Sequence, residues 1–277
     1  MSVICRKAEW SDLPALLNVE YKTMPTNCYL AAVSEKFYDK SQGVLFAAEV
    51  DGVIAGVSHI AFLSDGGSWF EVLRVMPEYQ KHGCGTKMWE AAFEAAKEHG
   101  CTSIRMYTGY TNKVSRGLAE RFGLTLTCQT REGVLLSENA GEECSDGFVR
   151  VTDPARAAEL AKPYISSYNG YFCRNRTFYE MGPVLWEDLC SQGTLWEKDG
   201  SIIDVGARQQ LDKGFQIGLV GGDVKACIAH AAKLMKDCGL PRLTAMIASS
   251  DEKLKKDLED CGFVFPEAQI IMLEKKF

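Results

Sequence analysis

The stretch LRVMPEYQKHGCGT, from Leu73 to Thr86, decides the fold. An apolar strand pattern ends at Pro77, and a turn containing Gly83 and Gly85 leads into a long amphipathic pattern. The first turn of a helix has unpaired backbone N–H groups and the positive end of the helix dipole, and glycines let a phosphate approach the backbone. We therefore predict a strand, an anion-binding turn and a helix, in that order.

The pattern on either side of this stretch is that of a mixed α/β protein. Upstream, the apolar runs 44–50 and 53–63 flank Asp51-Gly52, a dipeptide that favours a type I′ hairpin turn. Downstream, the predicted elements are a helix ending near His99, a strand over 103–108, a helix over 112–122, and a closing hairpin of residues 124–129 and 134–136.

A repeat extends this arrangement along the chain. The spacing from Gly100 to Gly123 equals the spacing from Gly239 to Gly262, and the single shift of register that carries Gly100 onto Gly239 superposes two helices and the strand between them. We therefore predict two tandem copies of one α/β fold, each a central mixed sheet flanked by helices. The predicted boundaries are 1–136 for the first copy, 137–146 for a small, polar linker and 147–277 for the second copy.

In this context the stretch resembles the GCN5-related N-acetyltransferase (GNAT) superfamily. The signature V-x-P-x-x-[RQ]-x-x-G-x-[GA] is met by Val75, Pro77, Gln80, Gly83 and Gly85. The resemblance covers roughly residues 1–136 and is fainter over 147–277. It implies acetyl-coenzyme A as co-substrate and direct attack of an amine on the thioester. The two-copy layout also loosely resembles histidine N-acetyltransferase-like proteins.

The resemblance further implies which residues contact the coenzyme. The main chain of Leu73, Arg74 and Val75 would pair with the pantetheine arm like an added strand. The pyrophosphate would lie on Lys81, His82, Gly83, Cys84, Gly85 and Thr86, and Gln80 of the signature would also bind the coenzyme. Asn112 would reach the coenzyme from the next helix, although it suits a helix N-cap equally well.

The second copy departs from the signature. The same shift of register places Leu219, Gly222 and Val224 at the positions of Gln80, Gly83 and Gly85, and it places Asp223 at the position of Cys84. A carboxylate at a helix N-terminus would occupy the phosphate site and repel a phosphate. We infer that the second copy is degenerate and has lost the coenzyme.

The candidate general base is Glu71, on the strand that would guide the coenzyme. Strand alternation would place Trp69, Glu71 and Leu73 on one face and Arg74 on the other, which sets Glu71 beside a backbone N–H near Leu73 that could polarise the thioester carbonyl. A solvent-exposed glutamate at a sheet edge accounts for Glu71 equally well.

The candidate general acid departs from the family pattern, which often has a tyrosine four residues before the glycine that ends the second helix. That position is Ala119 here. Tyr107 and Tyr110 are candidate substitutes, although both also fit packing aromatics. His59 lies within an apolar strand and fits a hydrogen-bonded core histidine. Cys84 begins a helix, which lowers a thiol pKa, but we assign it no catalytic role.

A second notable stretch runs from Tyr164 to Tyr179 and combines aromatic residues with Arg174 and Arg176. It fits a domain interface. Alternatively, it fits an acceptor pocket in which one of the two arginines binds a carboxylate bidentately.

Composition narrows the class of partner. A net charge of −6 disfavours a nucleic-acid or anionic-membrane surface. The longest nearly apolar run is far shorter than the roughly 18 residues of a membrane span. Eleven scattered cysteines without a C-x-x-C pair indicate free thiols and no metal site in a cytoplasmic protein.

The reaction that these observations predict is acetylation of a primary amine of a small molecule, with an amino acid as one candidate. A protein or peptide N-acetyltransferase is the alternative within the enzyme class. A non-catalytic acyl-CoA sensor is the alternative outside it. A monomer and a homodimer are both compatible with the sequence.

Overall fold

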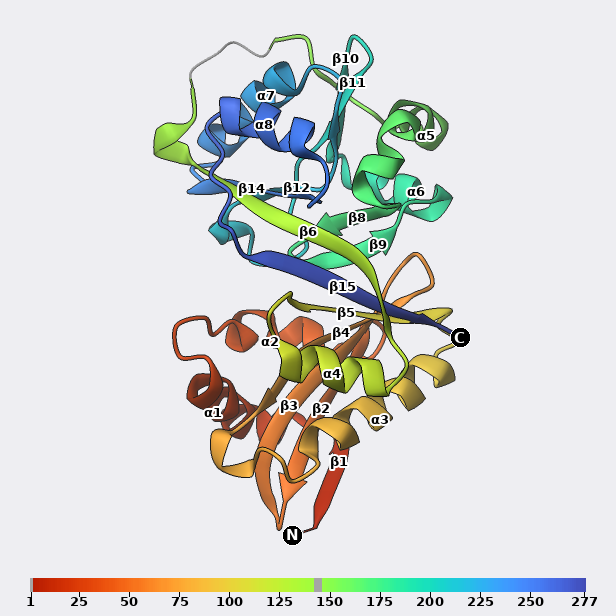
Figure 1. Ribbon diagram of the computed structural model, residues 1–277, viewed down its shortest axis with the longest axis vertical. Helices are drawn as coiled ribbons and strands as arrows, with labels where there is room; N and C mark the ends of the chain where they lie inside the picture. Colours follow the sequence, from red (N-terminus) through yellow and green to blue (C-terminus); the bar gives the residue numbers. More distant parts are fainter. Residues whose placement is uncertain (1, 142–145) are drawn as a thin grey trace. The chain divides into compact units, whose positions relative to one another are not determined.

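The computed structural model describes residues 2–141 and 146–277 (Figure 1). The chain divides into two compact units. Unit 1 holds the residues up to 106 together with 112–125 and 273–277, and unit 2 holds residues 107–111 and 126–272. The units are therefore not two consecutive segments of the chain, because residues 126–136 pack in unit 2 and the C-terminal residues pack in unit 1.

Residues 142–145 of the expected linker lie outside the described residues. The preceding part packs on unit 2: Ala140 is buried in its core, and Lys236 Nζ donates to Ala140 O at 2.8 Å.

Four antiparallel strands open the sheet of unit 1. They are hydrogen-bonded in the order β1 (Val3–Lys7), β2 (Gly43–Val50), β3 (Val53–Phe62) and β4 (Ser68–Val75). Asp51 and Gly52 join β2 to β3 with φ of 47° and 85°, which confirms the predicted type I′ turn. Next in the sheet come β5 (Ser103–Gly109), which pairs in parallel with β4, and β15 (Gln269–Lys276).

Helices lie on both faces of this sheet. They are α1 (Leu13–Thr23), α2 (Leu30–Tyr38), α3 (Cys84–Glu98) and α4 (Lys113–Arg121), with short 3-10 turns at Trp10–Asp12 and Pro77–Tyr79. Phe37 of α2 stacks on His59, whereas a Cβ at Gly56 would touch Met88 of α3. Because positions 56 and 59 point to opposite faces, α2 and α3 cover opposite sides of β3.

The predicted closing hairpin of residues 124–129 and 134–136 is wrong. Residues 125–136 form one continuous strand, β6 (Thr125–Leu136), which pairs antiparallel with β14 (Arg242–Ala248). Gly133 makes no turn there. A Cβ at Gly133 would lie 2.4 Å from the ring of Phe265, so glycine is needed because an aromatic ring packs on the strand.

The described residues of unit 2 form strands and four α-helices. Its first sheet has the order β13 (Val220–Gly221), β11 (Ser201–Asp204), β10 (Leu195–Lys198) and β7 (Val149–Arg150). β8 (Tyr171–Arg174) and β9 (Thr177–Glu180) form a hairpin, and β12 (Phe215–Ile217) pairs in parallel with β14. The helices are α5 (Pro154–Ala161), α6 (Pro183–Gln192), α7 (Val224–Asp237) and α8 (Glu252–Asp260), with 3-10 turns at Ser137–Asn139, Lys162–Tyr168 and Leu211–Lys213.

The internal repeat is present in the structure. The shift that carries Gly100 onto Gly239 also carries the bounds of β5 and α4 onto those of β14 and α8, and α7 corresponds to α3. Asn112 caps α4 and Asp251 caps α8, each by accepting from a backbone N–H three residues later. The fold is therefore mixed α/β, with a helix–strand–helix element that occurs twice.

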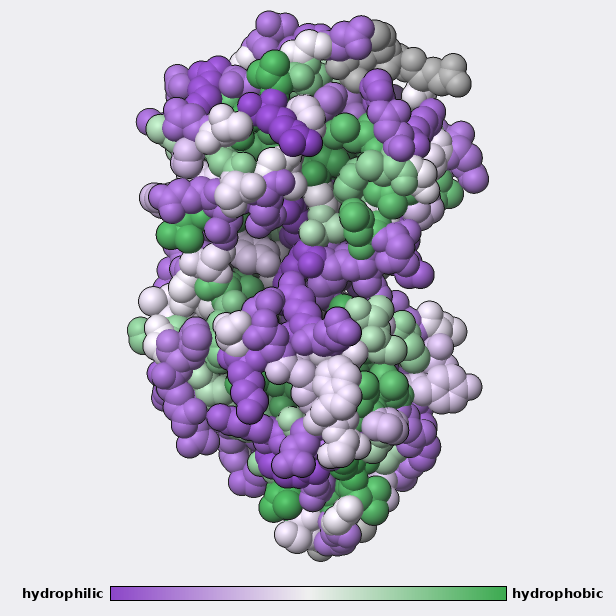
Figure 2. Space-filling view, turned by 180° about the vertical axis from the view of Figure 1, so that it is seen from behind, coloured by the Kyte–Doolittle hydropathy of each residue, from purple (hydrophilic) through white to green (hydrophobic). Residues whose placement is uncertain are grey.

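No helix in the part of the chain that the structure describes combines the length and the hydropathy needed to cross a membrane. Figure 2 shows hydrophilic and hydrophobic residues interspersed over the face in view.

Candidate functional site

The sheet of unit 1 opens between β4 and β5. The parallel pairing of these strands is limited to Ser68 with Ile104 and Trp69 with Arg105. Beyond Trp69 the described residues of β5 make no further pairs with β4, so the edge of Leu73 to Val75 that faces away from β3 is left open. An open strand edge offers N–H and C=O groups to an extended ligand. The residues predicted to bind the pantetheine arm lie on this edge.

A β-bulge shapes the same strand. Between the pairs His59–Glu71 and Val57–Arg74, β3 has one residue and β4 has two. Val72, one of the two, has φ of 60°, a conformation that β-branched residues rarely adopt. The extra residue brings Arg74 to the face of Glu71, so the alternation predicted for these two side chains is wrong. Arg74 Nε is buried without a hydrogen-bond partner among the described residues.

The turn after β4 leads into the N-terminus of α3. Gly83 is the N-cap with φ of 95°, and no side chain caps the first turn. Lys81 also has a positive φ, of 64°, and a Cβ at Gly83 would meet nothing within 4 Å. Successive backbone N–H groups in such a turn form a concavity for an anion. The predicted phosphate-binding residues therefore surround an uncapped helix start that faces open space.

The remaining residues of this turn differ in exposure. Gln80, Lys81 and His82 are exposed, Gly85 and Thr86 are half-buried, and Cys84 is buried. Gly85 lies against α4, since a Cβ there would approach Leu118 Cδ2 at 3.1 Å.

Asn112 serves as the N-cap of α4, with Oδ1 accepting from Ser115 N at 3.1 Å. Of the two roles that the sequence left open for it, the structure shows the capping role.

The corresponding helix of unit 2 starts differently. Asp223 is the N-cap of α7, and its Oδ1 accepts from Ala226 N at 3.0 Å. A Cβ at Gly222 would lie 2.6 Å from Ser201 Oγ. A carboxylate and a neighbouring side chain thus take the place that stays open at α3.

Glu71 is not a solvent-exposed glutamate. Its side chain is 7% exposed, and Oε1 lies 3.1 Å from Nδ1 of His59, which is itself buried. The imidazole ring stacks on Phe37 with ring centroids 3.9 Å apart. His59 is therefore a hydrogen-bonded core histidine, and its partner is the predicted base. The sequence suggested each residue separately, but no local pattern linked them.

The candidate acids lie on β5 and just after it. Tyr107 is half-buried, and the guanidinium of Arg176 lies over its ring at 5.8 Å. Tyr110 is 47% exposed, and its backbone N–H donates to Gln269 O. Ala119 is fully buried in α4.

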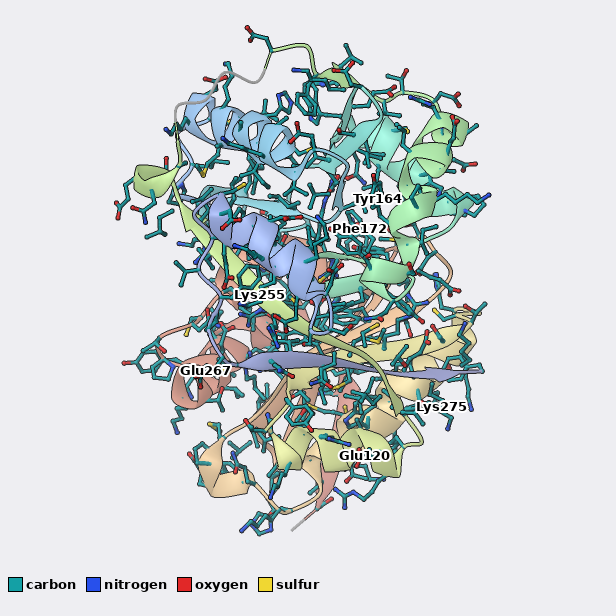
Figure 3. All side chains as sticks on the ribbon, turned by 45° about the horizontal axis from the view of Figure 1, so that its top comes forward. Glu120, Tyr164, Phe172, Lys255, Glu267 and Lys275 are labelled. Atoms are coloured by element: carbon teal, nitrogen blue, oxygen red, sulfur yellow. The ribbon has the colours of Figure 1, made fainter. Side chains whose placement is uncertain are left out.

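The aromatic stretch 164–179 forms part of the core of unit 2. Phe172 packs over Gly218 and Tyr164 packs over Gly221, where a Cβ would meet each ring at close range. Figure 3 labels the two aromatic side chains. Small residues at these positions let the rings pack against the backbone.

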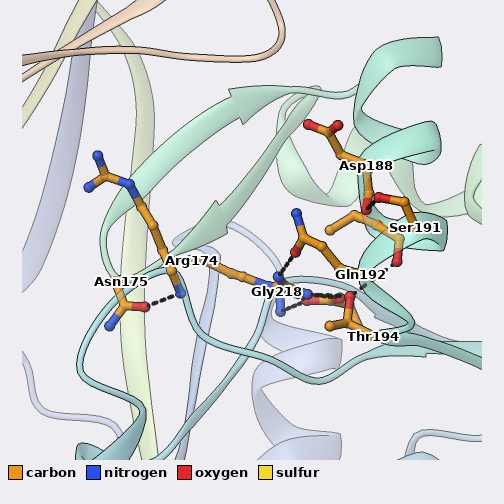
Figure 4. A network of polar contacts seen from close by, with 10 residues as sticks. Arg174, Asn175, Asp188, Ser191, Gln192, Thr194 and Gly218 are labelled. Carbon is orange, nitrogen blue, oxygen red and sulfur yellow. Dashed lines mark hydrogen bonds and ion pairs between the residues drawn. The ribbon is translucent and has the colours of Figure 1, made fainter. Parts of the chain in front are cut away.

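Arg174 is buried and fully engaged within unit 2 (Figure 4). Nε donates to Asp204 at 2.9 Å, Nη1 to Gln192 at 2.9 Å and Nη2 to Thr194 at 2.6 Å. These bonds leave Arg174 unsuited to bind a substrate carboxylate. Arg176 is more exposed and pairs with Glu132.

The cysteine of the glycine turn is a buried thiol. Burial raises the pKa of the Cys84 thiol, so the lowering expected from its helix position is wrong. Ten cysteines in the described ranges are free thiols, and Cys144 lies outside them. Residues 2–141 and 146–277 contain no cluster of three or more metal-binding side chains.

These features define a class: a mixed α/β protein whose sheet opens beside an uncapped helix N-terminus. Residues 10–124 match the family model described as Acetyltransferase (GNAT) family. The likeness to this family therefore rests on a segment that makes up less than half of the chain. None of the curated proteins matches the sequence.

Solved structures with the same fold cover the whole chain. A GCN5-related N-acetyltransferase from Sphaerobacter thermophilus superposes with a TM-score of 0.69 at 14% identity, covering 99% of this chain and 95% of that one. A tandem GNAT protein from the clavulanic acid biosynthesis pathway superposes with a TM-score of 0.63 at 13% identity, covering 99% of this chain and 98% of that one. A GCN5-related N-acetyltransferase from Kribbella flavida superposes with a TM-score of 0.57 at 10% identity, covering 99% of this chain and 71% of that one. At these identities the likeness concerns the fold alone.

Proposed function

We propose that the chain transfers the acetyl group of acetyl-CoA to a primary amine of a small molecule, and that unit 1 binds the coenzyme for this reaction. The observation that carries the proposal is the uncapped start of α3 at Gly83, placed directly after the open edge of β4. A coenzyme with an amide-containing arm and a pyrophosphate needs these two features side by side.

In this proposal the arm of the coenzyme pairs with the main chain of Leu73 to Val75. Its phosphates lie on the turn from Gln80 to Thr86, where Lys81 and His82 add exposed donors. Asn112 contacts the coenzyme through its amide nitrogen, which is a donor, while Oδ1 caps α4.

The acetyl transfer proceeds by direct attack. The amine nitrogen forms a bond with the thioester carbon, the carbon–sulfur bond breaks, and the nitrogen loses a proton to Glu71, directly or through water. A backbone N–H near Leu73 polarises the carbonyl oxygen. The thiolate takes up a proton and leaves as coenzyme A. His59 holds the Glu71 carboxylate in place through the 3.1 Å contact.

Unit 2 is proposed to be a degenerate copy that binds no coenzyme. The Asp223 carboxylate occupies the start of α7, where it would repel a phosphate. We further propose that the protein acts in the cytoplasm as a monomer or homodimer.

The alternatives are a protein or peptide N-acetyltransferase and a non-catalytic acyl-CoA sensor. The second gains support from Ala119, because a buried alanine stands where the family often has its tyrosine acid.

Acetyl-CoA binding tests the placement of the phosphate site. Gly83→Asp should abolish the rise in melting temperature caused by acetyl-CoA, because a carboxylate would face the phosphates. Gly83→Asn is the matched control, since asparagine has the same shape without the charge and tolerates a positive φ. An equal shift in the Asp variant and the wild type would refute the placement.

Thiol release from acetyl-CoA in the presence of pooled amino acids, polyamines or peptides then identifies the acceptor class. If no pool causes thiol release while acetyl-CoA still raises the melting temperature, the result would favour the non-catalytic sensor.

A further inference from the structure

A cavity of about 250 Å³ lies in unit 1, away from the proposed coenzyme site. The end of β1, α2, the start of β2 and the end of β3 contribute to its walls, together with the C-terminal turn of α3. The proposed phosphate site is at the N-terminus of α3. Because α3 has 15 residues, the two places are roughly 20 Å apart along the helix axis.

The floor of this cavity is apolar and partly aromatic. Phe37 and Leu45 are buried beneath it. Phe62 and His99 also line it, and their rings stack with centroids 3.6 Å apart. Such a floor suits an aliphatic or aromatic side chain.

The rim of the cavity carries charges of both signs. Lys7 and Lys40 line it, and neither Nζ has a carboxylate partner among residues 2–141 and 146–277. The neighbouring Arg6, by contrast, pairs with Asp12 and with Glu49. Glu98, the last residue of α3, also lines the cavity, and a helix C-terminus favours a positive charge.

We propose that this cavity binds a small zwitterion, an α-amino acid with an apolar or aromatic side chain. Its carboxylate lies between Lys7 and Lys40, its ammonium group lies at Glu98 and the end of α3, and its side chain lies on the floor formed by Phe37 and Phe62. The volume is below the ~300–1,000 Å³ of pockets that hold drug-sized ligands, which limits the occupant to a small metabolite.

Two side-chain contacts in series connect a wall of the cavity to the candidate base. Phe37 lines it and stacks on His59, which contacts Glu71. Gly43 also lines it, and a Cβ on Gly43 would lie 2.7 Å from His59 Nε2. Only one ring and one strand therefore separate a bound ligand from the His59–Glu71 contact. The ligand thus acts as an effector of acetyl transfer, a part of the inference that rests on the proposed function.

Binding is measured by calorimetry on the full chain without acetyl-CoA, so a failure of the proposed function does not affect it. Phenylalanine and leucine are the probes, and phenethylamine and hydrocinnamate are matched controls that each lack one charge. Only the zwitterions should bind. No binding by either amino acid, or equal binding by the controls, would overturn the proposal.

Variants locate the site. Lys7→Ala with Lys40→Ala should weaken binding at least tenfold, and Val44→Trp, which fills the cavity, should abolish it. Lys253→Ala with Lys256→Ala removes two exposed lysines of α8 and should leave binding unchanged. Unchanged affinity in the Lys7 and Lys40 variant would place the ligand elsewhere and refute the assignment.

The coupling between ligand binding in the cavity and catalysis is measured separately, by the rate of acetyl transfer. The amino acid should change kcat in the wild type and should change it less in Phe37→Leu, which keeps an apolar floor but removes the ring that stacks on His59. The same response in both proteins would refute the coupling.

Discussion

Glu71 and His59 illustrate how side chains at this site depend on one another. Glu71 Oε1 lies 3.1 Å from His59 Nδ1, and both side chains are almost fully buried. A buried carboxylate needs a partner, and the histidine in turn is held by the ring of Phe37. We expect His59 to act as a positioning residue for the proposed base.

His59→Ala should therefore lower kcat about ten- to hundredfold with little change in KM for acetyl-CoA, and Glu71→Gln should lower it about hundredfold or more. If the two residues act as one unit, the double variant should be no slower than Glu71→Gln alone. His59→Asn, which keeps a donor, should recover part of the activity. Additive losses in the double variant would contradict this dependence.

A second residue-scale prediction concerns acid stability. Hydrogen bonds from Arg6 hold the pKa of Asp12 below its ordinary value, with Nη1 2.6 Å from Oδ2. The folded-state pKa is thus lower than the unfolded one, so the contact stabilises the fold at pH values above about 4 and is lost as the pH falls through the folded-state pKa.

Asp12→Asn should lower the free energy of unfolding at pH 7 by about 1 kcal/mol, because Arg6 is partly exposed. The difference from the wild type should shrink towards pH 2–3. Urea titrations at several pH values measure it, and a difference independent of pH would contradict the assignment.

At the scale of elements, two equivalent helices begin in different ways. Gly83 leaves the first turn of α3 open, whereas Asp223 caps α7. The repeat therefore preserves the helix while it changes the chemistry of the helix start. A side-chain cap stabilises a helix, and an uncapped start leaves donors available for a ligand.

Asp223→Ala should lower the free energy of unfolding by about 1 kcal/mol, because Ala226 N loses its acceptor. Asp223→Asn, which keeps an acceptor, should cost much less. Urea denaturation checks both variants. An alanine variant as stable as the wild type would show that the cap contributes nothing.

At the scale of the whole molecule, the last residues of the chain pack in the same unit as its first residues. Residues 273–277 pack in unit 1, where Glu274 Oε1 accepts from Arg105 Nε at 2.7 Å. Arg105 also pairs with Asp65 at 2.5 Å, and all three side chains are buried. Such a cluster is destabilised strongly when one partner is removed, because the remaining charges stay buried.

Glu274→Ala should therefore lower the free energy of unfolding by about 3–5 kcal/mol. Asp257→Ala, which breaks a pair with the exposed Lys253, is the matched control and should cost much less. Thermal or urea unfolding measures both. Equal effects of the two substitutions would show that the buried cluster does not hold the C-terminal strand in unit 1.

Local features of the candidate site could be predicted from the sequence. The strand, turn and helix of residues 73–86 follow from a proline, two glycines and an amphipathic period. The sequence also indicated Glu71. The strand alternation placed Trp69 and Glu71 on the same face correctly, but it failed for Arg74, which lies beyond the bulge at Val72. A bulge depends on the pairing of two strands, so alternation along one strand could not reveal it.

The sequence alone determined the features whose physical cause lies within a few residues: the Asp51-Gly52 turn, the glycine turn before α3, the acidic start of α7, and the repeat. Only the tertiary structure decided that β6 is one strand, that Arg174 is buried against Asp204, and that Glu274 completes unit 1. Arg105 and Glu274 are 169 residues apart. Contacts at such separations depend on which surfaces meet after the chain has folded, and no local period or turn motif records them.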